Sequence, residues 1–217
     1  MTFYIGDMIQ YLPVMLEALW VSVYVSVAGF FAGSVIGVFI ALAKNMRFKL
    51  LRIIVSGYVE LMRNTPVLVQ LYLVYFGLGQ VGINLNPLWA AVVALTLNNS
   101  AYTSEIFRAG FESVPVGLRE AGSALGMSFP QIFRYVMFKP AVRNVLPSLT
   151  NQFIILFLFS SVGSVISLNE LTSLLLTLNS QTLQTVEVFT MGAILYYLAS
   201  AIIAGMSRTA ERVVFRW

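Results

Sequence analysis

The side chains that could do chemistry in this sequence are few and scattered. Its 217 residues include no His and no Cys, and Asp7 is the single Asp. Without imidazole or thiol groups, the chain lacks the usual metal ligands, nucleophile–base pairs and proton shuttles. The remaining Glu residues are too dispersed to form a catalytic cluster. The sequence therefore predicts no catalytic residue and no metal site.

Two acid–base pairs remain, and each spans one helical turn. Glu60 and Arg63, and likewise Glu105 and Arg108, stand three residues apart, which brings their side chains together on a helix. A charge at membrane depth must be paired, or must face a protein interior or a wet cavity. For Glu60 and Arg63 two interpretations stay open, an interfacial pair and part of a gate or pathway. We expect Glu105 and Arg108 to be structural.

Uncharged polar residues mark two further positions. Thr65-Pro66 removes a backbone donor and predicts a kink, with Gln70 one turn beyond it. Asn98 and Asn99 are adjacent, so their amides cannot both face one side of a helix. At least one is expected to bond a neighbouring helix, and interhelical bonding and substrate contact both stay open.

The most specific stretch runs from residue 113 to 147. Pro115 can open a short helix, and Ser128 with Gln131 predicts a capping box that starts a second one. One stripe of the first helix carries small and aliphatic residues: Leu118, Ala121, Ala124 and Leu125, beside Gly122 and Gly126. Two short helices at a fixed corner suggest docking onto a cytoplasmic partner. The alternative is an amphipathic loop on the lipid surface, although that usually carries bulkier apolar residues.

Composition indicates what holds these residues in place. The chain is 59% hydrophobic and 10% charged, against roughly 45–50% and about 25% in soluble domains. A membrane crossing needs about 20 apolar residues. We therefore predict an all-α membrane protein of one domain, residues 1–217. Five transmembrane helices are expected, at about 15–43, 54–78, 87–110, 145–168 and 186–207, with a cytoplasmic loop at about 113–143 between the third and fourth.

Basic residues set the predicted orientation. Of 13 Lys and Arg residues, all but Arg63 fall in three segments: the 44–52 loop, residues 105–143 and the C-terminal tail. The three opposite segments contain none. By the positive-inside rule the N-terminus is outside and the C-terminus cytoplasmic, in a multi-pass inner or plasma membrane protein. The N-terminal residues lack the basic region of a cleavable signal peptide, so the first span is expected to stay. This distribution argues against nucleic acid as a partner.

Several motifs, in order along the chain, carry a resemblance to a known family. Glu120-Ala121-Gly122, followed after three residues by Gly126, is similar to the Glu-Ala-Ala loop of importer permeases of the ATP-binding-cassette class. The stretches 58–70, 98–110 and 143–153 resemble the polar amino-acid uptake subgroup. The similarity covers about residues 12–210.

The resemblance implies a subunit that pairs with a second permease, two ATPase subunits and an extracytoplasmic solute-binding protein. It implies alternating access driven by ATP. The ATP and Mg²⁺ would be bound by the partner ATPase, because no Lys here stands in a Gly-Lys-Ser/Thr loop. The implied ATPase-coupling residues are Leu118, Glu120, Ala121, Gly122, Ala124, Leu125 and Gly126. The expected substrate pathway comprises Arg63, Gln70, Asn98, Asn99, Leu158, Phe159, Ser160 and Ser161, with Glu60, Pro66, Glu105 and Arg108 structural.

Two departures from the family pattern bear on function. Phe138-Lys139 stands where Leu-Pro is usual, with Pro140 one residue later, so the end of the second short helix could be shifted. Leu158-Phe159 aligns with a Lys-Asp pair in the fourth span. The loss of two membrane charges predicts a subunit with little polar recognition, paired with a non-identical relative that binds the substrate.

A different function class also fits five helices. A secondary carrier or channel subunit would need no ATPase partner, but such proteins usually place Asp, Glu or His at the midplane or contain an internal repeat. Neither feature is present. A neighbouring ATPase and binding protein would favour the importer.

Overall fold

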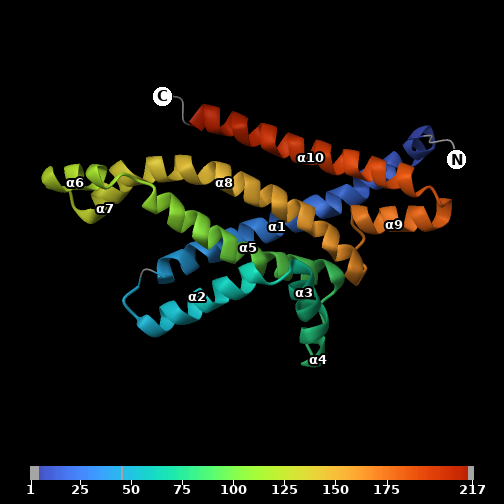
Figure 1. Ribbon diagram of the computed structural model, residues 1–217, viewed down its shortest axis with the longest axis horizontal. Helices are drawn as coiled ribbons and strands as arrows, with labels where there is room; N and C mark the ends of the chain where they lie inside the picture. Colours follow the sequence, from blue (N-terminus) through green and yellow to red (C-terminus); the bar gives the residue numbers. More distant parts are fainter. Residues whose placement is uncertain (1–4, 45, 215–217) are drawn as a thin grey trace.

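The computed structural model describes residues 5–44 and 46–214, and all regular elements in these ranges are helices. They form an elongated bundle, with α6 and α7 at one end and the N-terminus and α9 at the other (Figure 1). The long helices are α1 (Leu12–Lys44), α5 (Pro87–Glu112), α8 (Phe138–Phe159) and α10 (Thr185–Val214). The shorter helices are α2 (Lys49–Asn64), α3 (Val67–Tyr72), α4 (Leu78–Gln80), α6 (Val116–Ala124), α7 (Phe129–Gln131) and α9 (Leu171–Thr182). Ile5–Tyr11 and Ser160–Ile166 are 3₁₀-helical, and Leu73–Gly77 and Ile132–Met137 are π-helical.

Three helices of the described chain are long and apolar enough to cross a membrane. They are Met8–Lys44, Phe129–Ile166 and Thr185–Val213, which cover the first, fourth and fifth predicted spans. The third predicted span coincides with α5, whose 26 residues reach about 39 Å. α5 is less apolar than these three helices. Half of its residues are buried in the bundle, and the buried residues include the polar Asn98, Asn99 and Thr103. A helix in the bundle interior can carry polar groups that neighbouring helices satisfy.

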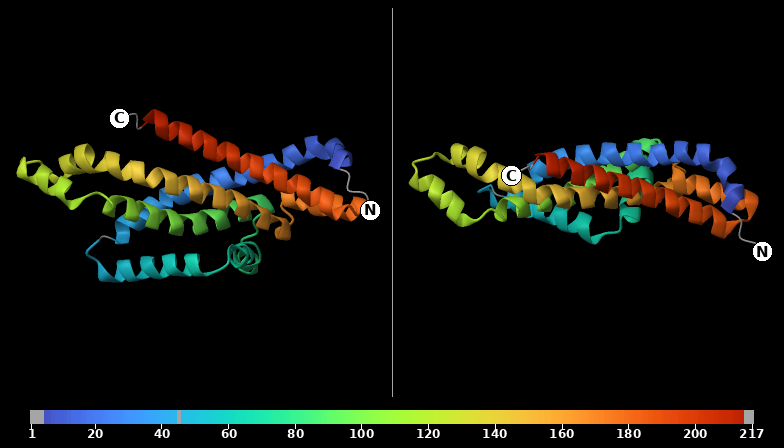
Figure 2. Two further views of the ribbon diagram at one scale, coloured as in Figure 1. Left: turned by 45° about the horizontal axis from the view of Figure 1, so that its top comes forward. Right: turned by 90° about the horizontal axis from the view of Figure 1, so that it is seen from above.

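The predicted helix over 54–78 is broken. α2 ends at Asn64, Thr65 is extended with φ −115° and ψ 143°, and α3 begins after Pro66. Proline has no N–H and disfavours a helical residue before it, which explains the break. In Figure 2 (left) the α3–α4 segment is seen almost end-on while α2 is seen from the side, so the chain turns sharply here. The kink expected at Pro66 is confirmed, but the continuous span is wrong.

The two short helices expected in the 113–143 loop are not both short. α6 is separate, but α7, the π-helical turn and α8 run as one helix from Phe129. Consequently no helix end follows Phe138-Lys139, and the fourth helix begins well before residue 145. The π-helical turn changes the hydrogen-bond register just ahead of Pro140. We infer that this change makes room for the proline ring in the helix. A further helix, α9, lies between the fourth and fifth predicted spans and was not expected.

A row of glycines lets α1 lie directly on α5. A Cβ atom built at Gly29 would lie 3.0 Å from the Leu95 Cβ, at Gly33 2.8 Å from the Asn99 Cβ, and closer still to the Thr103 Oγ1 at Gly37. Because the glycines leave the α1 backbone uncovered on this side, side chains of α5 donate hydrogen bonds to its carbonyl groups. The Thr103 hydroxyl donates to the Gly33 carbonyl at 3.3 Å, and the Asn99 amide donates to the Phe30 carbonyl at 3.1 Å. This small-residue packing fixes the two central helices together.

Candidate functional site

The α6 corner, where α6 ends and α7 begins, is held by backbone bonds at the end of α6 and by a bond to a side chain at the start of α7. At the end of α6, the Met127 N–H donates to the Gly122 carbonyl at 3.1 Å, and the Gly126 N–H to the Ser123 carbonyl at 3.0 Å. Gly126 has φ +74°, the left-handed conformation that this helix ending requires. The Ser128 N–H then donates to the Gln131 side chain at 2.8 Å. The predicted first helix and the predicted capping box are both confirmed.

Most of α6 is open to solvent at the tip of the bundle. Leu118, Glu120, Ala121, Ala124 and Leu125 are exposed, Leu125 by 81%. The two glycines of this stretch act inside the chain. Gly122 is buried, and a Cβ there would lie 3.0 Å from the Ile132 Cγ1, whereas nothing lies within 4 Å of a Cβ at Gly126. Gly122 therefore leaves room for the side chain of Ile132 to pack against α6. Gly126 is required for its left-handed backbone conformation and not for close packing.

An ionic cluster connects the ends of α1 and α5 near this corner. The Lys44 Nζ lies 2.5 Å from the Glu105 Oε1, and Arg108 bridges Glu105 and Glu112, both at 2.7 Å. The predicted Glu105–Arg108 pair is therefore confirmed. Lys44 also ends α1, where a cation complements the negative end of the helix dipole. The cluster holds the Lys/Arg-rich ends of the two helices in register.

The pair predicted between Glu60 and Arg63 does not form. In the described part of the chain no ion pair joins them. Instead, the Arg63 guanidinium lies 5.4 Å from the centroid of the Tyr102 ring, and the Tyr102 hydroxyl donates to the Arg63 carbonyl at 3.4 Å. Glu60 is exposed. The aromatic face on α5 draws the guanidinium away from Glu60 through a cation–π contact.

Arg63 lines a cavity of about 330 Å³ between α2, α5 and α8, which we call the α2–α5–α8 cavity. Tyr102, Glu105, Asn144 and Ser148 also line it. The Asn144 amide donates to the Ser113 hydroxyl at 2.8 Å, which links α8 to the segment leading into α6. The described residues hold no group of three or more His, Cys, Asp or Glu able to bind a metal. The polar groups of the lining are a guanidinium, a carboxylate, an amide and hydroxyls.

The other expected polar pathway residues bond one another. Gln70 donates to the Met62 carbonyl at 2.8 Å and the Thr65 carbonyl at 3.1 Å, replacing partners lost at the Pro66 break. It accepts from the Asn98 amide at 3.0 Å. On the opposite side, Asn99 accepts from Gln152 at 3.2 Å and reaches α1 as described above. The predicted bond to a neighbouring helix is confirmed, and both amides make one.

The polar side chains among residues 158–161 are hydrogen-bonded to nearby backbone carbonyls. Leu158 is 44% exposed, and Phe159 packs against the core around α5. The Ser160 hydroxyl donates to the Phe157 carbonyl and the Ser161 hydroxyl to the Leu158 carbonyl, both at 2.7 Å. Ser160 and Phe159 line a narrow void between α3, α5 and the 3₁₀ segment. This stretch has no unpaired polar side chain to offer a ligand.

A buried carboxylate at the opposite end of the bundle was not expected from the sequence. Glu170 is 0% exposed and accepts from the Ser173 N–H at 2.8 Å, the Thr172 N–H and the Tyr196 hydroxyl at 2.9 Å, and the Ser22 hydroxyl at 3.2 Å. It caps α9 and joins α1, α9 and α10. Burial raises the pKa of the Glu170 carboxyl, while the four donors oppose that shift. Glu is not among the preferred N-cap residues, so no local pattern marked it.

We expect Glu170→Ala to lower the melting temperature of the purified protein by about 6–12 °C, because it leaves several buried donors unpaired and removes a helix cap. Tryptophan fluorescence on heating would measure the change. Glu17→Ala, at an exposed Glu on α1, is the control and should move the midpoint by less than about 2 °C. Equal melting temperatures for both variants would show that the Glu170 contacts do not stabilise the fold.

Comparison with known proteins gives a consistent result along the whole chain. Residues 33–215 match the family described as "Binding-protein-dependent transport system inner membrane component". The arginine transport system permease protein ArtQ of Bacillus subtilis is 32% identical over 205 residues, covering 94% of each chain. The glutamine transport system permease protein GlnP of Escherichia coli is 32% identical over 203 residues and 93% of each chain. The nopaline transport system permease protein NocM of Agrobacterium fabrum is 33% identical over 213 residues, covering 94% of this chain and 88% of its own.

Solved structures agree with the sequence relatives. The crystal structure of an amino acid ABC transporter superposes with a TM-score of 0.91 at 35% identity, covering 98% of this chain and 99% of the matched chain. A chain of the MetNI methionine ABC transporter in an inward-facing conformation gives a TM-score of 0.75 at 22% identity, with 96% and 98% covered. The second likeness bears on the fold alone.

Proposed function

Because this chain belongs to the family of binding-protein-dependent transport system inner membrane components, we propose that it is the membrane subunit of an ATP-driven importer. In this role it forms half of a pathway for polar amino acids or related solutes. The names of ArtQ, GlnP and NocM, each for a nitrogen-rich solute, support this class. Its partners would be a second permease, two ATPase subunits and an extracytoplasmic solute-binding protein.

The observation that carries the proposal is the exposed α6 corner. A nine-residue helix stands at the tip of the bundle with exposed aliphatic side chains and the charged pair Arg119 and Glu120. Its C-terminal end is fixed by the backbone bonds of Gly126 and Met127. Through Ser113 and Asn144 it connects to α5 and α8, which border the α2–α5–α8 cavity. When the ATPase subunits bind ATP and Mg²⁺ and close, movement of α6 would be passed to these helices. The cavity would then open alternately to the two sides.

The test is to purify the tagged chain with its neighbouring ATPase and reconstitute the complex in liposomes. We expect uptake that needs ATP together with the binding protein. Uptake driven by an ion gradient in the absence of an ATPase would instead support a secondary carrier or channel subunit.

We expect the active complex to contain a second, non-identical permease. Residues 158–161 have no free polar group, so alanine at Leu158 or Phe159 should lower transport by less than about tenfold. Changes at the matching polar positions of the partner should abolish it. Mass spectrometry of the intact complex would count the subunits. Two copies of this chain that transport without another permease would rule out the heterodimer and direct attention to Arg63 and the α2–α5–α8 cavity.

The proposed orientation places α6 in the cytoplasm and α9 outside. The chain has no native Cys, so single cysteines can be labelled without background. In intact cells, an impermeant thiol reagent should modify Asn84→Cys and Ser180→Cys but not Ser123→Cys, and it should modify all three after permeabilisation. All three positions are exposed. Labelling of Ser123→Cys in intact cells, or protection of both outer sites, would overturn the orientation.

A further inference from the structure

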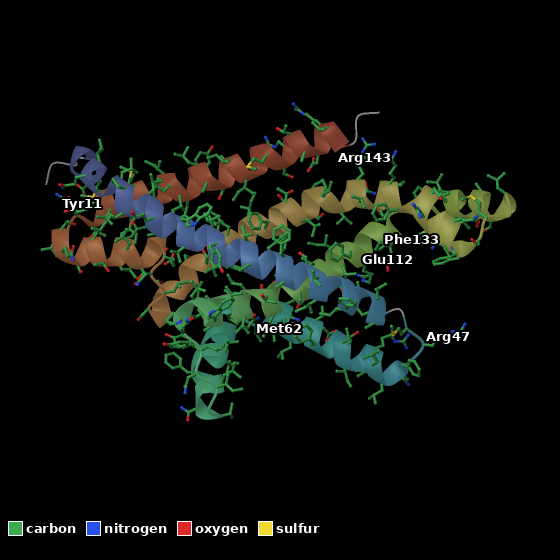
Figure 3. All side chains as sticks on the ribbon, turned by 180° about the vertical axis from the view of Figure 1, so that it is seen from behind. Tyr11, Arg47, Met62, Glu112, Phe133 and Arg143 are labelled. Carbon is green, nitrogen blue, oxygen red and sulfur yellow. The ribbon has the colours of Figure 1, made fainter. Side chains whose placement is uncertain are left out.

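A cleft of about 450 Å³ opens between α8 and α10 at the Lys/Arg-rich end of the bundle, and we call it the α8–α10 cleft. Arg143, Asn144 and Pro147 line it from α8, and Glu211 and Arg212 line it from α10. Deeper in the bundle, the hydroxyls of Thr150 and Ser207 are hydrogen-bonded and connect the two helices. Figure 3 shows Arg143 on α8 beside the C-terminal part of α10.

The cleft contains charged side chains of both signs, and among the residues that the structure describes only the acidic one has a hydrogen-bond partner. Arg143 and Arg212 are exposed, and within the described chain neither forms an ion pair. The single acid, Glu211, accepts a hydrogen bond from Ser207 at 3.3 Å. The lining therefore presents two guanidiniums and one carboxylate from facing helices, an arrangement that suits a ligand carrying both an anion and a cationic donor.

An apolar stripe on α10 leads toward the cleft. Leu198, Ile202 and Gly205 are exposed and precede Thr209 and Arg212 at alternating spacings of four and three residues, so they share one helix face. Leu198 is 50% and Ile202 62% exposed. An acyl chain could lie along this face while its headgroup reaches the charges at the end.

We propose that the α8–α10 cleft binds the headgroup of phosphatidylethanolamine. The phosphate accepts hydrogen bonds from the guanidiniums of Arg143 and Arg212, and the ammonium group donates to the Glu211 carboxylate. Basic pockets between membrane helices on the cytoplasmic side, where the proposed orientation places this cleft, are suited to lipid headgroups. Phosphatidylcholine has no N–H to donate, and phosphatidylglycerol has no cation to offset Glu211. Of these three headgroups, ethanolamine is therefore the one that satisfies all three side chains.

The test measures lipid retention and is independent of transport. The complex is purified in detergent with equal amounts of phosphatidylethanolamine, phosphatidylcholine and phosphatidylglycerol, and native mass spectrometry quantifies bound lipid. We expect the wild type to retain phosphatidylethanolamine preferentially. Arg143→Gln with Arg212→Gln should reduce its retention by about tenfold or more, whereas the control, Arg134→Gln with Arg208→Gln, should not. Arg134 and Arg208 are exposed but lie outside the cleft lining.

Glu211→Gln gives a readout that unfolding would not produce. This variant should still retain phospholipid but should lose the preference for ethanolamine over choline, because only the contact to the ammonium group is weakened. Equal loss in the cleft and control variants, or no headgroup preference in the wild type, would overturn the proposal. So would displacement of the bound lipid by free L-glutamine, which would assign the charges to a solute, or a cross-link from Arg212→Cys to the second permease, which would assign the cleft to a protein interface.

Discussion

Gly33→Leu should strongly destabilise the fold of the chain. A Cβ at this position already lies 2.8 Å from both the Asn99 Cβ and the Thr96 carbonyl oxygen, and Leu adds three more carbon atoms. α1 would have to move away from α5, which would break the bonds from Asn99 to Phe30 and from Thr103 to Gly33. Overpacking costs about 1–3 kcal/mol for added methylenes, and two lost buried bonds add a similar amount.

The expected fall in melting temperature is therefore about 8–15 °C, accompanied by reduced yield from the membrane. Gly205→Leu is the matched control, since Gly205 also lies in a long apolar helix but a Cβ there meets nothing within 4 Å. It should express and melt like the wild type. If Gly33→Leu behaved like this control, the close approach of α1 and α5 would not be essential to the fold.

Structural features of this chain could be predicted from the sequence where they depend on neighbouring residues alone. The kink at Pro66, the capping box at Ser128 and the start of α6 after Pro115 follow from backbone restrictions on one or two residues, and each was predicted. The complete break of the helix at Pro66 was not. Glycines four residues apart at 29, 33 and 37 are a known packing signal and could have been noticed. However, the spacing does not say that α5 is the helix they contact.

Features that depend on contacts distant in sequence escaped prediction. Glu170 caps α9 through N–H groups two and three residues away. It becomes a hub only because Ser22 and Tyr196, more than 20 residues away, fold against it. The continuity of α7 with α8 depends on a π-helical turn that has no residue pattern of its own. Similarly, the spacing of Glu60 and Arg63 was correct for a pair, but Tyr102 on another helix competes for the guanidinium.

The structural role of Gly126 has to be separated from the coupling role that we propose for it. Its φ of +74° means that Gly126→Trp would strain the end of α6 as well as obstruct any docking partner. Lost activity in that variant would not separate the two effects. Gly126→Asn should preserve the corner, because Asn tolerates the left-handed conformation, and it should stay active if backbone conformation is all that the position requires.

Glu120→Lys tests the docking of α6 without disturbing its fold. Glu120 is exposed, so the reversal should leave insertion and melting temperature unchanged. At a contact with the ATPase it would replace an attractive charge with a repulsive one, and we expect substrate-stimulated ATP hydrolysis by the reconstituted complex to fall by about tenfold or more. The ATPase subunits alone should keep their basal rate.

Glu17→Lys makes the same charge change at an exposed residue in the N-terminal half of α1, and this half lies away from α6. The complex with this variant should hydrolyse ATP like the wild type. This comparison separates a local effect at the corner from a general effect of two added positive charges. Raising the salt concentration should weaken the difference between the variants, since exposed charges at a protein interface are screened. Normal stimulated hydrolysis in Glu120→Lys would show that the charge at the α6 corner does not contribute to coupling, and contact with the ATPase would then have to rest on its aliphatic residues, Leu118 and Leu125.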